Sequence, residues 1–168
     1  MRKISTKNYV IYMIIVLITI TFVIFLSKWY ETKKDGQTTH RMSSIVEIKE
    51  KDLDNYLVEN PSIIIYLSNS HNIGLKNFEK EFNKYILKNN LNKKMVYIDL
   101  NGVSKNFDKK LKNKLGIDAS SSYINVNFNE DENIIIIDDS ELVSILYNTN
   151  ININMDDVKL FLRGNREW

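Results

Sequence analysis

The sequence predicts an α/β fold with a mixed sheet, arranged as a three-layer sandwich and preceded by one transmembrane helix. Three observations indicate this fold class: a long uncharged segment near the N-terminus, short runs that are apolar at every position, and apolar residues at helical spacing between those runs. A strand that is apolar on both faces belongs in the middle of a sheet that helices cover on both sides. Strands that alternate with helices predict parallel pairing with right-handed crossovers.

The uncharged segment comprises residues 8–27, reads NYVIYMIIVLITITFVIFLS, and lies between Lys7 and Lys28. At about 1.5 Å per residue, a helix of that length spans the roughly 30 Å hydrocarbon core of a bilayer. A cleaved signal peptide is the alternative, but the segment is long for one and no A-x-A-like site follows it. Aromatic residues near its two ends predict interfacial contacts with lipid; they are Tyr9, Tyr12, Trp29 and Tyr30.

We therefore expect a single-pass protein of the cell membrane, with lipid as one partner. Basic residues flank the segment almost equally on both sides, so the positive-inside rule gives little bias in orientation. A leader this short is typical of signal anchors, which favours an extracytoplasmic position for the soluble domain. The expected parts are a membrane anchor at 1–30, a polar linker at 31–42 and a soluble domain at 43–168.

Charge and composition exclude several functions for the soluble part. Four of the 23 basic residues and none of the acidic residues precede position 31, which leaves 19 basic against 21 acidic residues. A nucleic-acid partner is not expected, because such a surface carries a clear basic excess. The chain has no cysteine, and its two histidines, His40 and His71, are far apart in the sequence. We expect no disulfide, no metal site and no cofactor.

The first part of the soluble domain begins with a short strand at 45–48. Residues 50–59 have apolar side chains at helical spacing, and Pro61 ends that helix because the residue before a proline avoids the α conformation. The run SIIIYL at 62–67 is apolar on both faces and rich in β-branched residues, which predicts a core strand.

A polar loop, SNSHNIG, then leads into a helix at 75–88. The apolar stripe of that helix consists of Leu75, Phe78, Phe82, Tyr85 and Ile86. The run MVYIDL at 95–100 predicts a second core strand. Residues 107–115 predict a basic amphipathic helix whose lysines form a solvated face.

The C-terminal part closes the sheet with a hairpin. Residues 116–131 show no clear period, but the apolar run at 134–137 predicts a third core strand. A turn at 138–141 joins it to an alternating strand at 142–147, and a helix at 155–163 ends the pattern. The hairpin adds antiparallel strands to parallel ones, so the predicted sheet is mixed.

This order of elements resembles the thioredoxin fold over residues 45–163. The segment SIIIYLSNSHNIGLKNFEKEFNKYI is similar to that family's core strand, active-site loop and long helix. MVYIDL is similar to its next strand, and NIIIIDDSELVSILYN to its closing hairpin. The chain is most similar to small membrane-anchored thioredoxin-like proteins of low-GC Gram-positive bacteria, among them the bacteriocin transport accessory proteins.

The chain departs from that family at the two features that carry its chemistry. Thioredoxins have a C-x-x-C motif at the start of the long helix, and the corresponding positions here are Asn72 and Leu75. Family members also have a cis-proline just before the third core strand, near Glu132 or Asn133, whereas the single proline of this chain is Pro61. Thiol–disulfide exchange requires a thiolate, so the oxidoreductase activity implied by the resemblance does not transfer.

In thioredoxin-like proteins the active-site loop and the loop before the third core strand form a groove where extended peptides dock. The resemblance therefore implies a binding groove with two sides. One side is Asn69, Ser70, His71, Asn72 and Ile73; the other is Asp131, Glu132 and Asn133. We expect a redox-inactive binding or accessory module with a protein or peptide partner, for example in bacteriocin export or among cell-envelope proteins.

Two alternatives stay open. The first is an enzyme with non-thiol chemistry at the Ser68–Asn72 loop, because Ser70 and His71 are the residue types of a nucleophile and its base. They are adjacent in sequence, however, and no third orienting group is legible, so a polar loop that caps a helix is the simpler interpretation. The second alternative is a purely structural subunit of a membrane complex. We expect the protein not to be an enzyme.

Overall fold

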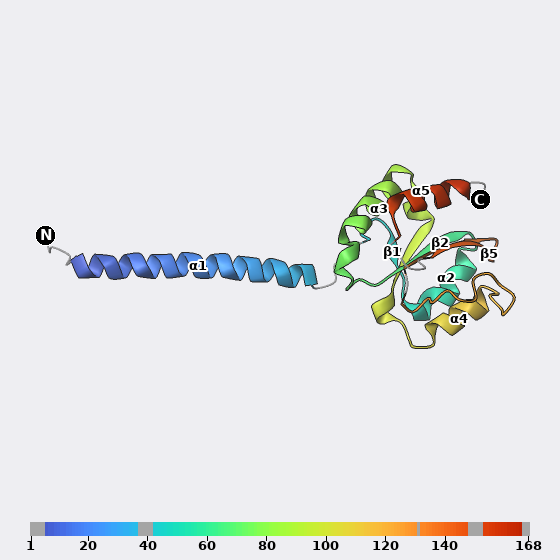
Figure 1. Ribbon diagram of the computed structural model, residues 1–168, viewed down its shortest axis with the longest axis horizontal. Helices are drawn as coiled ribbons and strands as arrows, with labels where there is room; N and C mark the ends of the chain where they lie inside the picture. Colours follow the sequence, from blue (N-terminus) through green and yellow to red (C-terminus); the bar gives the residue numbers. More distant parts are fainter. Residues whose placement is uncertain (1–5, 37–41, 131, 148–152, 166–168) are drawn as a thin grey trace. The chain divides into compact units, whose positions relative to one another are not determined.

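The computed structural model describes residues 6–36, 42–130, 132–147 and 153–165. The chain divides into two compact units, residues 1–39 and 40–168. The first unit contains one continuous helix, α1, from Thr6 to Gly36 (Figure 1). The end of α1 extends into the segment that the sequence suggested as a linker.

Side chains in α1 are described at position 10 and at 12–26, and all of them are exposed. Of the four aromatic residues expected at the ends of a membrane segment, Tyr12 is 63% exposed, and the side chains of the other three lie outside the described set. Within the described residues, no helix was found with both the length and the apolarity needed to cross a membrane.

The second unit is built on a five-stranded mixed sheet with the order β1-β3-β2-β4-β5. The strands are β1 (Val46–Glu47), β2 (Ile63–Ser68), β3 (Met95–Asp99), β4 (Asn133–Asp138) and β5 (Glu141–Tyr147). β1, β3 and β2 are parallel, while β4 is antiparallel to both β2 and β5. The predicted combination of parallel strands and a closing antiparallel hairpin is confirmed.

The two most apolar runs form the centre of this sheet. β2 pairs with β4 in a register that sets Ile64 opposite Ile136 and Ile65 opposite Ile135. All four side chains have no exposed surface. A strand reaches such burial on both faces only when both are covered, as the apolar composition of these runs predicts.

Helices cover both faces of the sheet, and Figure 1 shows them as two outer layers. The helices are α2 (Leu53–Glu59), α3 (Lys76–Lys88), α4 (Phe107–Lys114) and α5 (Met155–Gly164). Leu53 of α2 and Leu111 of α4 belong to one apolar cluster. Phe82 of α3 and Val158 of α5 belong to the other. The predicted helix bounds agree with the observed bounds to within a few residues; a 3-10 turn, Glu50–Asp52, precedes α2.

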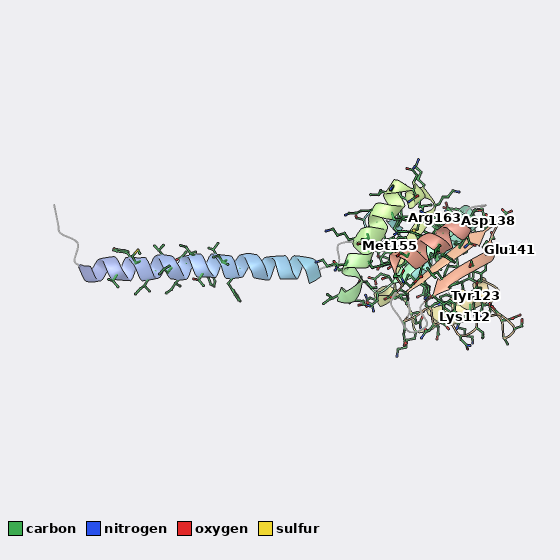
Figure 2. The ribbon with its side chains drawn as sticks, turned by 45° about the horizontal axis from the view of Figure 1, so that its top comes forward. Lys112, Tyr123, Asp138, Glu141, Met155 and Arg163 are labelled. Atoms are coloured by element: carbon green, nitrogen blue, oxygen red, sulfur yellow. The ribbon has the colours of Figure 1, made fainter. Side chains whose placement is uncertain are left out.

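The segment from 116 to 130, which has no clear period in the sequence, consists mainly of turns. It nevertheless buries Ile117, Val126 and Phe128 against the α2–α4 side of the sheet. Figure 2 marks Tyr123 of this segment, whose ring lies edge-on to Tyr147 with centroids 6.2 Å apart. Irregular backbone has no fixed side-chain period, which is why pattern analysis does not identify these buried positions.

Three lysines of α4 form ion pairs, which the sequence did not predict. Lys110 forms an ion pair with Glu50 at 2.7 Å, and Lys114 forms one with Asp54 at 2.6 Å. Lys112 lies 3.0 Å from Asp108 on the same helix. Lys110 and Lys114 are nevertheless exposed, as predicted for a solvated face, whereas Lys112 is half-buried.

Candidate functional site: the loop after strand β2 and the carboxyl group beneath it

The loop 69–73 joins β2 to α3 at the edge where the parallel strands β2 and β3 end. The Ser70 hydroxyl donates a hydrogen bond to Oδ2 of Asp99 at 2.6 Å, and the Ser70 backbone N–H donates to Oδ1 at 3.1 Å. The Asn101 amide donates to Oδ1 of Asn69 at 2.7 Å. The register aligns Ser68 with Asp99, so strand pairing brings Asp99 next to the loop. Side chains from the end of β3 thus hold the loop in one conformation.

Two opposing influences set the pKa of Asp99. Partial burial is the largest single influence and raises its pKa, but hydrogen bonds from Ser70 and Asn101 together outweigh it and hold the pKa below its ordinary value. Asp99 is therefore an ionised acceptor that fixes the loop. A carboxylate of lowered basicity is a poor general base near neutral pH, so it gives little activation to the Ser70 hydroxyl.

Ser70 and His71 do not form the nucleophile–base pair of the enzyme alternative. The hydroxyl of Ser70 is directed to Asp99, and the backbone N–H of His71 donates to Oδ1 of Asn69 at 2.9 Å. His71 is exposed. Ser68, the other serine of this loop region, is fully buried and donates to Glu79. The hydroxyls of Ser68 and Ser70 thus each donate to a carboxylate.

Asn72 and Leu75 are the residues that the sequence resemblance aligns with the two cysteines of the resembled family. Oδ1 of Asn72 accepts from the N–H of Gly74 at 3.1 Å and caps the 3-10 turn Ile73–Leu75 that leads into α3. Leu75 is 1% exposed and packs in the interior. Between them, Ile73 is 80% exposed. Asn72 is therefore a helix cap, Leu75 a core residue, and Ile73 an exposed apolar side chain between them.

The two expected sides of the groove lie in contact. The Asn72 side-chain amide donates to Oε1 of Glu132 at 3.2 Å, across 60 residues of sequence. Glu132 is 7% exposed, and Asn133 has no exposed surface and pairs with Leu67 as the first residue of β4. Asp131 lies outside the described residues. The structure thus brings the loop and the segment before β4 together, with the polar side chains of the latter turned inward.

A buried carboxyl group at the end of β2 was not identified from the sequence. Glu79 of α3 is 1% exposed. Its Oε1 accepts hydrogen bonds from the hydroxyl of Ser68 at 2.9 Å and from that of Tyr66 at 3.4 Å. The Tyr97 hydroxyl donates to the Ser68 carbonyl at 3.2 Å. Two hydroxyl groups of β2, those of Ser68 and Tyr66, therefore donate to one buried carboxyl group, and Tyr97 of β3 holds the backbone of Ser68.

Burial is the main cause that raises the pKa of the Tyr66 phenol well above its ordinary value, and the negative charge of Glu79 is the next. The charge of Glu132 acts in the same direction. Tyr66 is therefore a neutral hydrogen-bond donor at physiological pH. The sequence did carry a signal for Glu79, because it lies four residues after Leu75 and three before Phe82, on the buried stripe of α3.

The chemistry available at this site is limited. The chain has no cysteine, so it has no thiolate for disulfide exchange. No cluster of three or more histidine, aspartate or glutamate side chains suited to a metal ion was found among the described residues. What the loop does offer is fixed backbone geometry and one exposed apolar side chain.

Comparisons with solved structures found distant similarity to several chains, including the following three. Mitochondrial thioredoxin 3 from Saccharomyces cerevisiae is 13% identical, with 76% of this chain and 99% of that chain covered and a TM-score of 0.47. A chain from the yeast mitochondrial 1-Cys peroxiredoxin and glutathione/thioredoxin thiol-resolving system is 12% identical, with 75% and 97% covered and a TM-score of 0.46. A candidate oxidoreductase with a thioredoxin fold is 10% identical, with 73% and 96% covered and a TM-score of 0.47.

No family model and no curated protein matches the chain. The likeness to solved structures concerns the arrangement of elements alone, and nothing about activity follows from it. The second unit is an α/β fold with a mixed five-stranded sheet, with the strand order and closing hairpin described above.

Proposed function

We propose that this chain is a membrane-anchored, redox-inactive thioredoxin-like domain that binds an extended segment of a partner protein at the loop 69–73. The observation that supports this most directly is the combination of a fixed loop with an exposed apolar tip. Asp99 and Asn101 hold the start of the loop, Asn72 holds its end, and Ile73 between these supports is 80% exposed.

A fixed loop favours binding because little conformational freedom is lost when a partner docks. Complete burial of an isoleucine side chain contributes roughly 1.5–3 kcal/mol, which suits one anchor residue in a modest interface. Backbone groups of an extended segment can supply the remaining contacts through main-chain hydrogen bonds. The site is thus suited to recognition of a peptide segment.

The runner-up function, an enzyme with non-thiol chemistry at the Ser68–Asn72 loop, has less support. Ser68 is buried on Glu79, and the hydroxyl of Ser70 is held by a carboxylate of lowered pKa. His71 is exposed and is not bonded to either serine. A purely structural role in a membrane complex is a third possibility, and it differs from our proposal in not requiring Ile73.

The proposed membrane anchor rests on the uncharged run 8–27. Two side-chain contacts in α1 are consistent with it. The hydroxyl of Thr19 donates to the carbonyl of Ile15 at 2.9 Å, and that of Thr21 donates to the carbonyl of Leu17 at 2.8 Å. Both hydroxyl groups are therefore satisfied within the helix, as a lipid environment requires. An accessory role in peptide or bacteriocin export rests on sequence resemblance alone.

Site-specific photo-crosslinking in native membranes tests the binding proposal. A photoreactive residue at position 73 should give a discrete adduct, identified by mass spectrometry. Val58 on α2 is the matched control, because it is an apolar side chain with the same 80% exposure. Ile73→Asp should abolish co-purification of the crosslinked partner, whereas Val58→Asp and His71→Ala should leave it unchanged.

The results that would contradict the proposal are equally specific. Adducts of equal yield from positions 73 and 58 would mean general surface exposure and no docking site. Retention of the partner by Ile73→Asp would place the interaction elsewhere. Loss of function in His71→Ala with the partner still bound would favour the enzyme.

A further inference from the structure

The outer face of α3 carries lysines at a regular spacing. One lysine follows another every four residues along the helix, and all four are exposed; they are Lys76, Lys80, Lys84 and Lys88. Side chains four residues apart lie on the same face of a helix. The opposite face of α3 packs into the core through Phe82 and Ile86. At about 1.5 Å per residue, the four lysines form a basic ridge roughly 18 Å long.

The segment that contains this basic ridge has a clear excess of positive charge. Residues 76–94, which comprise α3 and the turn after it, contain six lysines and two glutamates. Glu79 is 1% exposed, so Glu81 is the acid that this segment presents to solvent. The rest of residues 31–168 has 13 basic and 19 acidic residues. Positive charge is therefore concentrated on α3, in a part of the chain that is otherwise acidic.

The neighbouring helix does not offset this charge. α5 packs against α3 on the same side of the sheet. It has as many basic as acidic side chains, namely Asp156, Asp157, Lys159 and Arg163. Asp156 and Lys159 form an ion pair within α5 itself. The basic ridge thus keeps its positive charge in the folded unit.

Three lysines of the basic ridge also differ from the three ion-paired lysines of α4. Among the residues that the structure describes, Lys80, Lys84 and Lys88 form no ion pair and no side-chain hydrogen bond, whereas each of those α4 lysines has a carboxylate within 3.0 Å. Like charges four residues apart destabilise a helix, and an anionic surface facing the ridge removes that cost. The ridge is therefore complementary to an anionic surface outside the described chain.

An exposed apolar side chain lies within the basic ridge. Leu87 is 56% exposed, and it follows Lys80 by seven residues and Lys84 by three, which places it on the same face. Where a helix rests on a bilayer, apolar side chains enter the headgroup region while lysines extend to the phosphates. A leucine among lysines therefore suits a lipid surface better than a nucleic acid or a small soluble anion.

The proposed membrane anchor supplies such a surface, and this step rests on the proposed function. The uncharged run ends at residue 27, and the second unit is described from Met42. The connecting residues reach at most about 50 Å when fully extended, so an anchored chain keeps the second unit near the bilayer. Contact with lipid is then intramolecular and has a high effective concentration, which makes a few lysines sufficient.

We propose that the basic ridge of α3 docks the second unit on anionic lipid headgroups of the bilayer, through Lys80, Lys84 and Lys88. Basic clusters of about this size are typical of helices that bind anionic lipid. Ile73 lies three residues before α3, so docking also holds the proposed partner site close to the membrane.

Fluorescence quenching of the full-length chain in lipid nanodiscs tests the proposal. The chain has no cysteine, so one introduced cysteine carries the dye: Asn77→Cys on α3, or Val58→Cys on α2 at the other face of the sheet. The discs contain phosphatidylcholine alone or with an equal part of phosphatidylglycerol, and a nitroxide on the headgroup is the quencher. We expect phosphatidylglycerol to increase quenching at position 77 and not at position 58. High salt should abolish the increase, because it screens exposed charges.

A charge-matched pair of variants identifies the groups responsible. The test variant replaces Lys80, Lys84 and Lys88 by glutamine. Each lysine near an anionic leaflet contributes about fivefold, so this variant should lower the docking equilibrium by roughly a hundredfold. The control variant replaces three exposed lysines outside α3, on the α2–α4 side, and should dock as the wild type does; it is Lys51→Gln, Lys105→Gln, Lys109→Gln.

Several outcomes would overturn the proposal. Equal quenching at position 77 in both lipids would exclude docking on anionic headgroups, and equal losses in the two triple variants would mean an effect of net charge alone. If the wild type ignores phosphatidylglycerol while the α3 variant loses an acidic protein from native membranes, the basic ridge binds protein.

Failure of the membrane anchor gives a different result. A full-length chain that does not co-elute with neutral nanodiscs lacks the anchor. Sedimentation of that chain with phosphatidylglycerol vesicles, and not with phosphatidylcholine vesicles, then provides the same comparison for the basic ridge. A chain that co-elutes with neutral discs but does not respond to phosphatidylglycerol contradicts the docking proposal and leaves the anchor in place.

Discussion

Replacement of Ser68 by alanine tests how strongly the buried carboxyl group of Glu79 depends on its hydrogen bond. The two side chains are 0% and 1% exposed, and the hydroxyl lies 2.9 Å from Oε1. Ser68→Ala removes the hydroxyl, so Oε1 of Glu79 loses the nearer of its two hydroxyl donors at a position that is closed to water. Loss of a hydrogen bond to a charged group costs about 1.5–3 kcal/mol, and we expect this reduction in the free energy of unfolding.

Ser62→Ala is the matched control. The hydroxyl of Ser62, just before β2, donates to Oδ1 of Asp138 at 2.5 Å, and this pair is exposed. Figure 2 marks Asp138 at the end of β4 beside the turn to Glu141. Although this bond is the shorter of the two, water can replace it, so the substitution should cost within about 0.5 kcal/mol. Burial of the hydrogen bond, and not its length, should determine which variant loses more stability.

Urea unfolding of the fragment 37–168, followed by far-ultraviolet circular dichroism, measures both effects. With a slope of about 1–3 kcal/mol per molar urea, Ser68→Ala should lower the midpoint by about 1 M, and Ser62→Ala should hardly change it. An equal or larger cost for Ser62→Ala would refute the reasoning from burial. A cost below about 0.5 kcal/mol for Ser68→Ala would show that Glu79 is satisfied without this serine.

Three further predictions follow. Ile65→Ala or Ile136→Ala should each cost about 2–5 kcal/mol in a denaturant melt, because both side chains are 0% exposed; a change near zero would contradict the packing. Burial and the charge of Glu79 raise the folded pKa of Tyr66, so above about pH 10 the unfolded state loses this proton first. Stability should then fall by up to about 1.4 kcal/mol per pH unit, a component that Tyr66→Phe lacks; identical alkaline slopes would refute it. Carbonate washing should leave the full-length chain in the membrane pellet while the fragment 37–168 is soluble and folded, and release of the full-length chain would exclude a membrane anchor.

The core strands could be predicted from the sequence because their signal is local. A run such as Ile63–Leu67 is apolar at every position, which is compatible only with coverage of both faces. The same local signal identified the run at 134–137 and set most element bounds. The ion pair Lys112–Asp108 is also local, since the two residues are one helical turn apart.

The contacts that define the candidate site are not local, and the sequence could not supply them. The Ser70–Asp99 hydrogen bond depends on the register of β2 against β3, and the Asn72–Glu132 bond joins positions 60 residues apart. Glu79 lies on the apolar stripe of α3. A charged residue is not counted among the apolar positions of a helix, so Glu79 is not recognised as buried. Its hydrogen-bond partner Ser68 lies on β2, and the sequence does not indicate that β2 and α3 are in contact at this point.

The arrangement of strands also has a consequence for the unfolded chain. The central strands contain the uncharged runs IIIYLS and NIIII, and short segments of this kind tend to form cross-β aggregates. In the folded sheet β2 lies between β3 and β4, and β4 lies between β2 and β5, so neither run has a free edge.

The outer strands are poor templates for a second chain. β1 has two residues, and β5 begins with Glu141 and pairs with β4 through a register shift between Ile136 and Ile137. Short, charged or bulged edges discourage pairing between molecules. We therefore expect aggregation mainly during folding, before β4 and β5 have paired with β2. Refolding yield should fall as protein concentration rises, even under conditions in which the folded sheet is fully stable.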